Sequence, residues 1–146
     1  MKVVCTANSG AILPGAYLDP RAGYDTHTEF RLTVGKEYVV YALAFRDTQV
    51  WYYIVDDAEL WYPVHHPAPL FDVIDDSLSG YWKYRFMPEN LDYLALFTFE
   101  EWRSDPHFYE RLTEHAEEEV SIFERIKSLM DSETPANAPN DTTKLS

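Results

Sequence analysis

Histidine and aspartate side chains that could transfer protons occur in two neighbouring segments of the chain. His65 and His66 lie in a proline-rich stretch, and the pair Asp56–Asp57 lies shortly before them. An imidazole and a carboxylate that meet in a cleft can act as general base and general acid. One hypothesis is therefore a small hydrolase or lyase that uses His65, His66 and nearby acids in a cleft beside the predicted sheet.

The same residues also have a structural explanation. The pairs Asp56–Asp57 and Asp75–Asp76 fall where predicted strands end, and aspartate favours turns because its side chain bonds nearby backbone N–H groups. Adjacent side chains of an extended segment point to opposite sides, so His65 and His66 cannot chelate one ion together. We therefore predict no catalytic residue and no metal site from these patterns.

The remaining reactive side chains match no motif. His115 with Glu118 and Glu119 has neither the zinc-binding nor the di-iron spacing, and Cys5 lies in a short apolar strand with no base fixed beside it. We expect Cys5 to be a buried structural thiol. The sequence also lacks a glycine-rich phosphate loop and a dinucleotide fingerprint, so we predict no cofactor.

Charge and length restrict the partners and the compartment. The chain has 146 residues and a formal charge of −13, with 46% hydrophobic residues, enough for one core. Such a charge repels phosphate backbones and anionic membranes, which argues against direct nucleic-acid or membrane binding and favours a basic protein partner. With one cysteine, no secretory signal and no apolar stretch of roughly 20 residues, a cytoplasmic protein is expected.

Alternating apolar residues predict an antiparallel sheet. They indicate strands over residues 30–45, 49–55, 70–74 and 78–87, the first two joined as a hairpin. Residues 8–29 form a long ordered loop in this interpretation, and the three prolines of residues 61–69 predict an irregular connector. The predicted fold class is α+β, with a small antiparallel barrel or curled sheet over about residues 30–87.

A long amphipathic helix is predicted after the strands. Asp105–Pro106 is a typical helix start, and apolar residues then recur at steps of three and four to Met130, so the helix covers about residues 106–131. Residues 91–99 could be a strand or a helical turn. The prediction is one globular domain over residues 1–131 and a disordered tail over residues 132–146.

Three segments carry a resemblance to a known group of proteins. Leu32–Val40, Tyr53–Asp57 and Pro69–Ile74 resemble the SH3-like barrel modules of small bacterial and phage proteins that are uncharacterised or of the immunity type. The resemblance implies a barrel in which Leu32–Val40 begins a strand, Asp56–Asp57 marks a turn and Pro69–Ile74 closes the barrel.

The favoured functional hypothesis is a protein-binding module, namely an immunity-type protein that neutralises a toxin by covering a basic site. Complementary charge would speed encounter, and buried aromatic anchors would hold the complex. The alternatives are the hydrolase or lyase described above and an acidic mimic of nucleic acid that occupies a DNA-binding protein. The residues expected at the partner surface come from the N-terminal loop, the proline-rich connector and the helix: Tyr17, Tyr24, Trp61, Tyr62, His65, His66, Glu114, Glu117 and Glu118.

Overall fold

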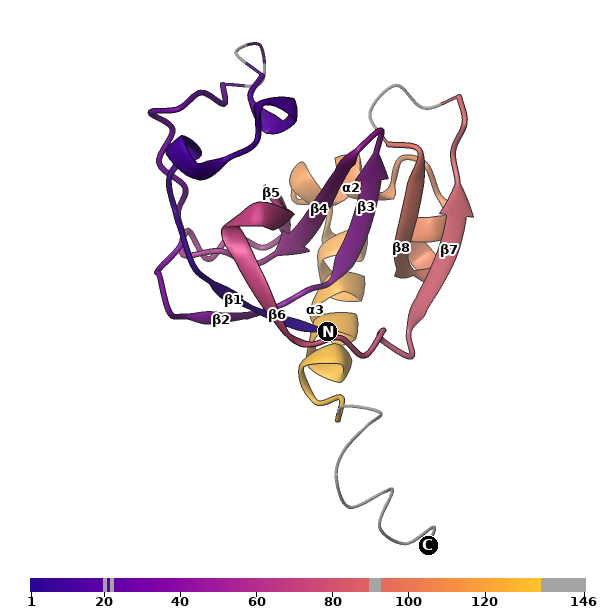
Figure 1. The fold of residues 1–146 in the computed structure, drawn as a ribbon. Coiled ribbons are helices and arrows are strands. Elements are labelled where there is room, and N and C mark those ends of the chain that lie inside the picture. Colours follow the sequence, from indigo (N-terminus) through magenta and orange to yellow (C-terminus); the bar gives the residue numbers. More distant parts are fainter. Residues whose placement is uncertain (20, 22, 90–92, 135–146) are drawn as a thin grey trace, which may run out of the picture.

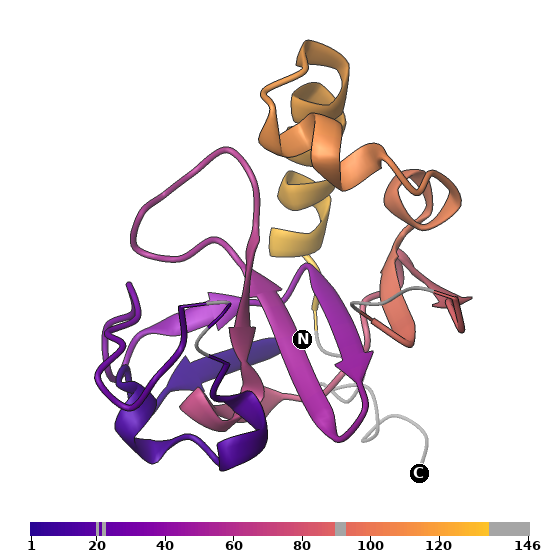
Figure 2. The ribbon, with the colours of Figure 1, turned by 90° about the horizontal axis from the view of Figure 1, so that it is seen from above.

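Two antiparallel sheets followed by three helices make up the fold (Figures 1 and 2). The computed structural model describes residues 1–19, 21, 23–89 and 93–134. The smaller sheet has the order β2-β1-β6, formed by Glu37–Val39, Lys2–Cys5 and Phe71–Asp75. The larger has the order β5-β4-β3-β8-β7, formed by Val64–Pro67, Gln49–Ile54, Ala42–Arg46, Ala95–Phe99 and Trp82–Phe86.

The predicted α+β class is confirmed, whereas a closed barrel is not found. Within the described ranges the strands pair in two separate ladders, one of three strands and one of five. The chain crosses from the small sheet to the large one between β2 and β3, so the single strand predicted over residues 30–45 is wrong. Apolar residues occupy both odd and even positions of that segment because β2 and β3 belong to different sheets and bury their side chains against different neighbours.

The predicted hairpin is confirmed. Strands β3 and β4 pair in register from Ala42 opposite Tyr53 to Arg46 opposite Gln49. Only Asp47 and Thr48 lie between the paired residues Arg46 and Gln49, and Asp47 has a φ of 50°. Aspartate tolerates this left-handed conformation better than most residues, which is why a two-residue turn forms here.

The proline-rich connector contains a strand that the sequence analysis missed. Val64–Pro67 forms β5, which pairs with β4 so that His65 faces Tyr53 and Pro67 faces Trp51. A proline lacks the N–H that a central strand needs on one side. Because β5 is the edge of the larger sheet, it needs hydrogen bonds on one side only, and the proline is accommodated.

The single long helix predicted over residues 106–131 is two helices. After α1 (Glu100–Ser104), α2 spans Phe108–Thr113 and α3 spans Glu117–Asp131. His115 between them has a φ of 66°, which ends α2 and turns the chain. The ambiguous stretch before these helices is resolved as a strand where it is described, because Ala95–Phe99 forms β8.

Helix α3 packs on the end of the larger sheet and fixes the start of β3. Phe123, Ile126 and Met130 are buried, and Phe123 meets the ring of Tyr41 edge-on at 5.5 Å. The Tyr41 hydroxyl also donates a hydrogen bond of 2.6 Å to Asp131. The buried apolar side chains form one cluster. None of the helices in the described ranges is long and apolar enough to cross a membrane.

Part of the segment assigned to the tail is described by the structure. Glu133 accepts hydrogen bonds from the Ser79 hydroxyl at 2.6 Å and from the Gly80 N–H at 2.8 Å, so it belongs to the fold. Residues 135–146, also assigned to the tail, lie outside the described residues.

Asp57 ties the segment before β2 to the end of β4. Its carboxylate accepts hydrogen bonds from Thr33 Oγ1 at 2.6 Å, Lys36 Nζ at 2.8 Å and Tyr38 Oη at 2.8 Å. Partial desolvation acts to raise the pKa of Asp57, but the bonds from Lys36, Thr33 and Tyr38 outweigh it and lower the pKa to about 2. Asp57 is therefore a structural anchor of the fold.

Replacing Asp57 should make the protein less stable at neutral pH and less sensitive to acid. A carboxyl whose pKa falls from 3.8 to about 2 on folding stabilises the protein above pH 3.8, and this stability is lost as the pH falls toward 2. Asp57→Asn should cost about 1 kcal/mol at pH 7 after allowance for solvent screening, and should flatten the stability profile between these pH values. Urea unfolding across this range measures both effects. Asp76→Asn, at an exposed turn position, is the control, and an unchanged acid profile in Asp57→Asn would contradict the assignment.

Candidate functional site

One face of the five-stranded sheet forms the base of a cavity of about 740 Å³. Cross-strand partners project from the same face, and side chains two residues apart in a strand do so as well. The pairing registers therefore gather seven cavity-lining side chains on this face: Arg46 of β3, Gln49, Trp51 and Tyr53 of β4, His65 of β5, Leu96 of β8 and Arg85 of β7.

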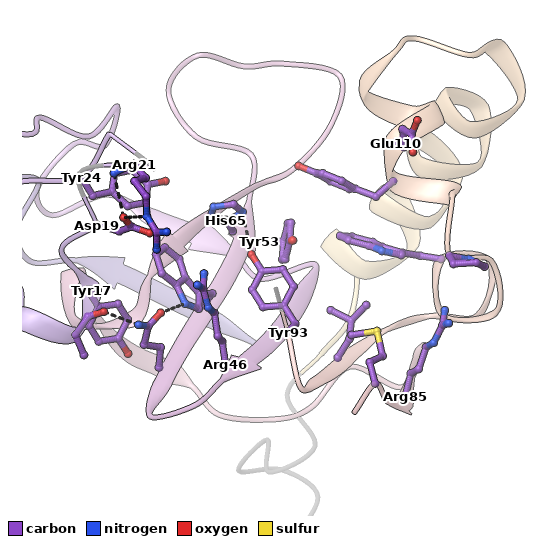
Figure 3. Close-up of a pocket in the computed structure, with 18 of the residues that line it drawn as sticks. Tyr17, Asp19, Arg21, Tyr24, Arg46, Tyr53, His65, Arg85, Tyr93 and Glu110 are labelled. Carbon is purple, nitrogen blue, oxygen red and sulfur yellow. Dashed lines mark hydrogen bonds and ion pairs between the residues drawn. The ribbon is translucent and has the colours of Figure 1, made fainter. Parts of the chain in front are cut away.

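The N-terminal loop (residues 8–29) forms one side wall (Figure 3). The Gln49 amide nitrogen donates to the Ala16 carbonyl, and the Gln49 amide oxygen accepts from Trp51 Nε1 at 2.9 Å. The Tyr17 hydroxyl accepts a bond of 2.8 Å from the Val50 N–H. These bonds hold the loop against the β3–β4 hairpin, so the wall is part of the folded structure.

Helices α1 and α2 form the opposite wall. Trp102 of α1 and Tyr109 of α2 stack with their ring centroids 4.9 Å apart, and the Tyr53 ring meets Trp102 edge-on at 4.9 Å. The Tyr109 hydroxyl donates a hydrogen bond of 2.7 Å to the Pro63 carbonyl, and burial raises the pKa of Tyr109. The rings of Trp102 and Tyr109 form the apolar part of this wall, and Asp105 and Glu110 line the cavity beside them.

His65 lies between the two walls, next to Tyr53 and Tyr93 (Figure 3). Its Nδ1 shares a hydrogen bond of 3.1 Å with the Tyr93 hydroxyl. Its ring contacts Trp51 edge-on at 5.1 Å and Tyr53 at 5.6 Å. These contacts orient the imidazole as one more planar side chain of an aromatic lining.

The cavity also carries charges of both signs. Asp19 lies 3.5 Å from Arg21, and its pKa is lowered by the Arg21 backbone N–H and, less strongly, by the guanidinium groups of Arg21 and Arg46. Asp105 forms an ion pair with Arg111, and its pKa is lowered by the His107 N–H and then by Arg111. Both carboxylates are therefore ionised at neutral pH and have cationic neighbours.

Three of the residues expected at the partner surface line this cavity. Tyr17 and Tyr24 contribute from the N-terminal loop, and His65 contributes from β5. The Tyr24 ring stacks on Trp51 with centroids 5.9 Å apart, and burial raises the pKa of its hydroxyl. The loop that the sequence suggested as a contact surface is thus a wall of this cavity.

His66 lies on the other face of the sheet and is paired with Asp56. Its Nε2 is 2.8 Å from the Asp56 carboxylate, and the two residues are 5% and 7% exposed. Phe30 and Phe71 surround the imidazole at 5.8 and 6.5 Å. Asp56 also accepts from the Ala58 N–H at 2.9 Å. His66 and Asp56 therefore do form a histidine–carboxylate pair, but the pair is buried in the core and does not line the cavity.

Trp61 lies at a second location, the junction between α2 and α3, where the predicted acids Glu114, Glu117 and Glu118 are exposed on the helix ends. Trp61 Nε1 donates a hydrogen bond of 2.8 Å to the Leu112 carbonyl, and its ring contacts His115 at 4.5 Å. Trp61 is 38% exposed and packs against Tyr62. We call this surface the Trp61 junction: Trp61, Tyr62, His115 and the exposed acids Glu114, Glu117 and Glu118.

Several lining residues were not anticipated from the sequence. Trp102, Tyr109 and Arg46 line the cavity, and none of them was among the residues predicted for the site. Strand alternation could have indicated part of the lining, because Gln49, Trp51 and Tyr53 are alternate residues of β4 and project from the same face of the sheet. What the sequence could not supply was the segment that covers that face.

No metal site is evident in the described part of the chain, where no group of three or more histidine, cysteine, aspartate or glutamate side chains could hold an ion. Cys5 is buried, as expected, and its thiol donates to the Ala7 carbonyl at 3.3 Å. Burial raises the pKa of this thiol, which keeps it protonated and unreactive.

Comparisons with known proteins give no relative. No family model matches the chain, and neither a curated protein nor a solved structure is similar to it. The functional argument therefore depends on the cavity and the Trp61 junction themselves.

Proposed function

We propose that this protein binds a small ligand in the cavity between the N-terminal loop and helices α1 and α2. The observation that carries the proposal is the cavity itself, whose volume of about 740 Å³ lies within the roughly 300–1,000 Å³ common for ligand sites. Its lining combines aromatic rings with charged and polar side chains, so it offers both apolar surface and groups that can orient a ligand. The hydrogen bonds of Gln49 and Tyr17 hold one wall in place, which lowers the cost of ordering on binding.

Binding is favoured over hydrolysis by the arrangement of the histidines. A general base must reach the substrate, and the buried pair of His66 with Asp56 lies on the face of the sheet opposite the cavity. His65 does line the cavity, where it contacts the Tyr93 hydroxyl and the rings of Trp51 and Tyr53. The proton-transfer set proposed from the sequence is therefore divided between the core and the cavity.

Filling the cavity from its exposed wall should prevent binding without disturbing the core. Ala16 lines the cavity and is exposed, so Ala16→Phe adds a ring to the open space. We expect the affinity for the neutral fluorescent probe N-phenylnaphthylamine to fall by about tenfold or more, with an unchanged melting temperature. Fluorescence titration measures the affinity. Ala11→Phe, at an exposed position of the same loop outside the lining, is the matched control. Equal probe binding in both variants and the unmodified protein would overturn the proposal.

A second candidate function is the binding of a basic protein by the Trp61 junction, as in an immunity-type protein. The supporting observation is that the chain brings Trp61 to His115 at 4.5 Å, beside three exposed glutamates. An exposed tryptophan next to helix ends that carry acids suits a basic partner protein. Long-range electrostatic attraction would speed the association of the two proteins. The resemblance of Leu32–Val40, Tyr53–Asp57 and Pro69–Ile74 to SH3-like immunity modules supports the same candidate; in this chain these segments contribute to both sheets.

Charge reversal at the junction should weaken such a complex. We expect the tagged protein to retain a stoichiometric basic partner from its native cytosol at low salt and less of it at moderate salt. Glu118→Lys should reduce capture by about tenfold because it places like charges together. Glu124→Lys, exposed farther along α3, changes the net charge equally and should capture the partner normally. Absence of a partner at both salt concentrations, or equal loss in the two variants, would exclude this candidate.

A further inference from the structure

Two arginines on the cavity face lack a carboxylate partner. Arg46 ends β3 and Arg85 lies in β7, on either side of β8, and both line the cavity. Within the described residues neither guanidinium forms an ion pair with a carboxylate. Arg85 donates one hydrogen bond of 3.0 Å, to the Arg103 carbonyl, so most of its N–H groups remain available.

Two of the three acids of the lining contact an arginine. Asp19 is in ion-pair contact with Arg21, and Asp105 with Arg111, which also binds Glu119. The third acid, Glu110, is exposed on α2 and lies 3.8 Å from His107. Asp19 is near enough to Arg46 for a through-space effect on its pKa, without ion-pair contact between them. The uncompensated charges at the base of the cavity are therefore positive.

The charge balance of the cavity differs from that of the molecule as a whole. The chain has 12 lysines and arginines against 25 acids, whereas three arginines and three acids line this cavity, and Arg46 and Arg85 lie on its sheet face. Charges more than about 10 Å away are largely screened at ordinary salt, so a ligand in the cavity interacts with Arg46 and Arg85 and only weakly with the distant acids. An anionic group is thus favoured here despite the net charge of −13.

The aromatic wall suits a planar body and not a cation. A cage for an ammonium group needs open space between ring faces, as in aromatic sites for quaternary amines. Here Tyr53, Trp102 and Tyr109 contact one another with centroids 4.9–5.4 Å apart, so they leave no space for a cation between them. Together they present a continuous apolar wall, against which a flat ring system can pack.

We propose that the ligand of this cavity is an aromatic ring system that carries an anionic group, such as a carboxylate, sulfonate or phosphate. The ring system packs between the N-terminal loop and the wall of Tyr53, Trp102 and Tyr109. The anionic group accepts hydrogen bonds from the guanidinium group of Arg46 or of Arg85, a charge-assisted contact for which arginine is well suited. This inference rests on the proposed ligand-binding function and specifies its ligand class.

Two fluorescent probes with the same aromatic body test the inference. Anilinonaphthalenesulfonate carries a sulfonate, and N-phenylnaphthylamine is neutral. We expect the unmodified protein to bind the sulfonate probe about tenfold more tightly than the neutral one, as judged by fluorescence titration. Removing the arginine that binds the sulfonate, by Arg46→Gln or by Arg85→Gln, should abolish most of this difference because the sulfonate probe then binds about tenfold more weakly. Retention of the full difference in both variants would overturn the anionic contact.

The controls separate the ligand class from the existence of the site. Arg31→Gln changes the net charge equally at an exposed position outside the cavity and should keep the preference for the sulfonate. Ala16→Phe should abolish the binding of both probes. Equal affinity for the two probes, with loss of both in Ala16→Phe, would overturn the anionic ligand and leave the binding site intact. Binding of both probes that is insensitive to Ala16→Phe would overturn the ligand-binding function as well.

Discussion

The fold and the cavity both depend on strand β4 being covered on its two faces. Trp51, Tyr52, Tyr53 and Ile54 are 5%, 8%, 4% and 0% exposed. Tyr52 packs on Phe71 of the smaller sheet, with ring centroids 5.8 Å apart, whereas Trp51 and Tyr53 line the cavity. A strand with large rings on both faces needs a second layer on each side. The smaller sheet supplies one layer, and the N-terminal loop with helices α1 and α2 supplies the other.

The sequence predicted the parts of the fold that local patterns determine. The β3–β4 hairpin follows from alternation around a two-residue turn, and the strand β6 follows from a short apolar run. The break at His115 could not be read in this way, because the apolar residues Leu112, Ala116 and Val120 keep a spacing of four across it. Strand β5 was missed because proline forbids a central strand, and only the sheet order shows that β5 is an edge.

The candidate site was predictable only in part, for a similar reason. Tyr17, Tyr24 and His65 stand out as aromatic residues in loops or connectors, which is where binding residues concentrate. Arg46 and Trp102 carry no local signal, and their role arises from strand order and from the helices that follow β8. Contacts between residues far apart in the sequence thus decide which side chains share the cavity.

The cavity and the Trp61 junction share the same two elements, the segment before β5 and helix α2. Tyr109 of α2 lines the cavity and donates to the Pro63 carbonyl at 2.7 Å, while Trp61 donates to the Leu112 carbonyl of the same helix at 2.8 Å. His65 continues the segment into the cavity. A shift of α2 would move Tyr109, which is part of the helix. It would also move Trp61, which is hydrogen-bonded to the helix through the Leu112 carbonyl. Ligand binding and partner binding would therefore act on one shared element, although the two surfaces attract opposite charges.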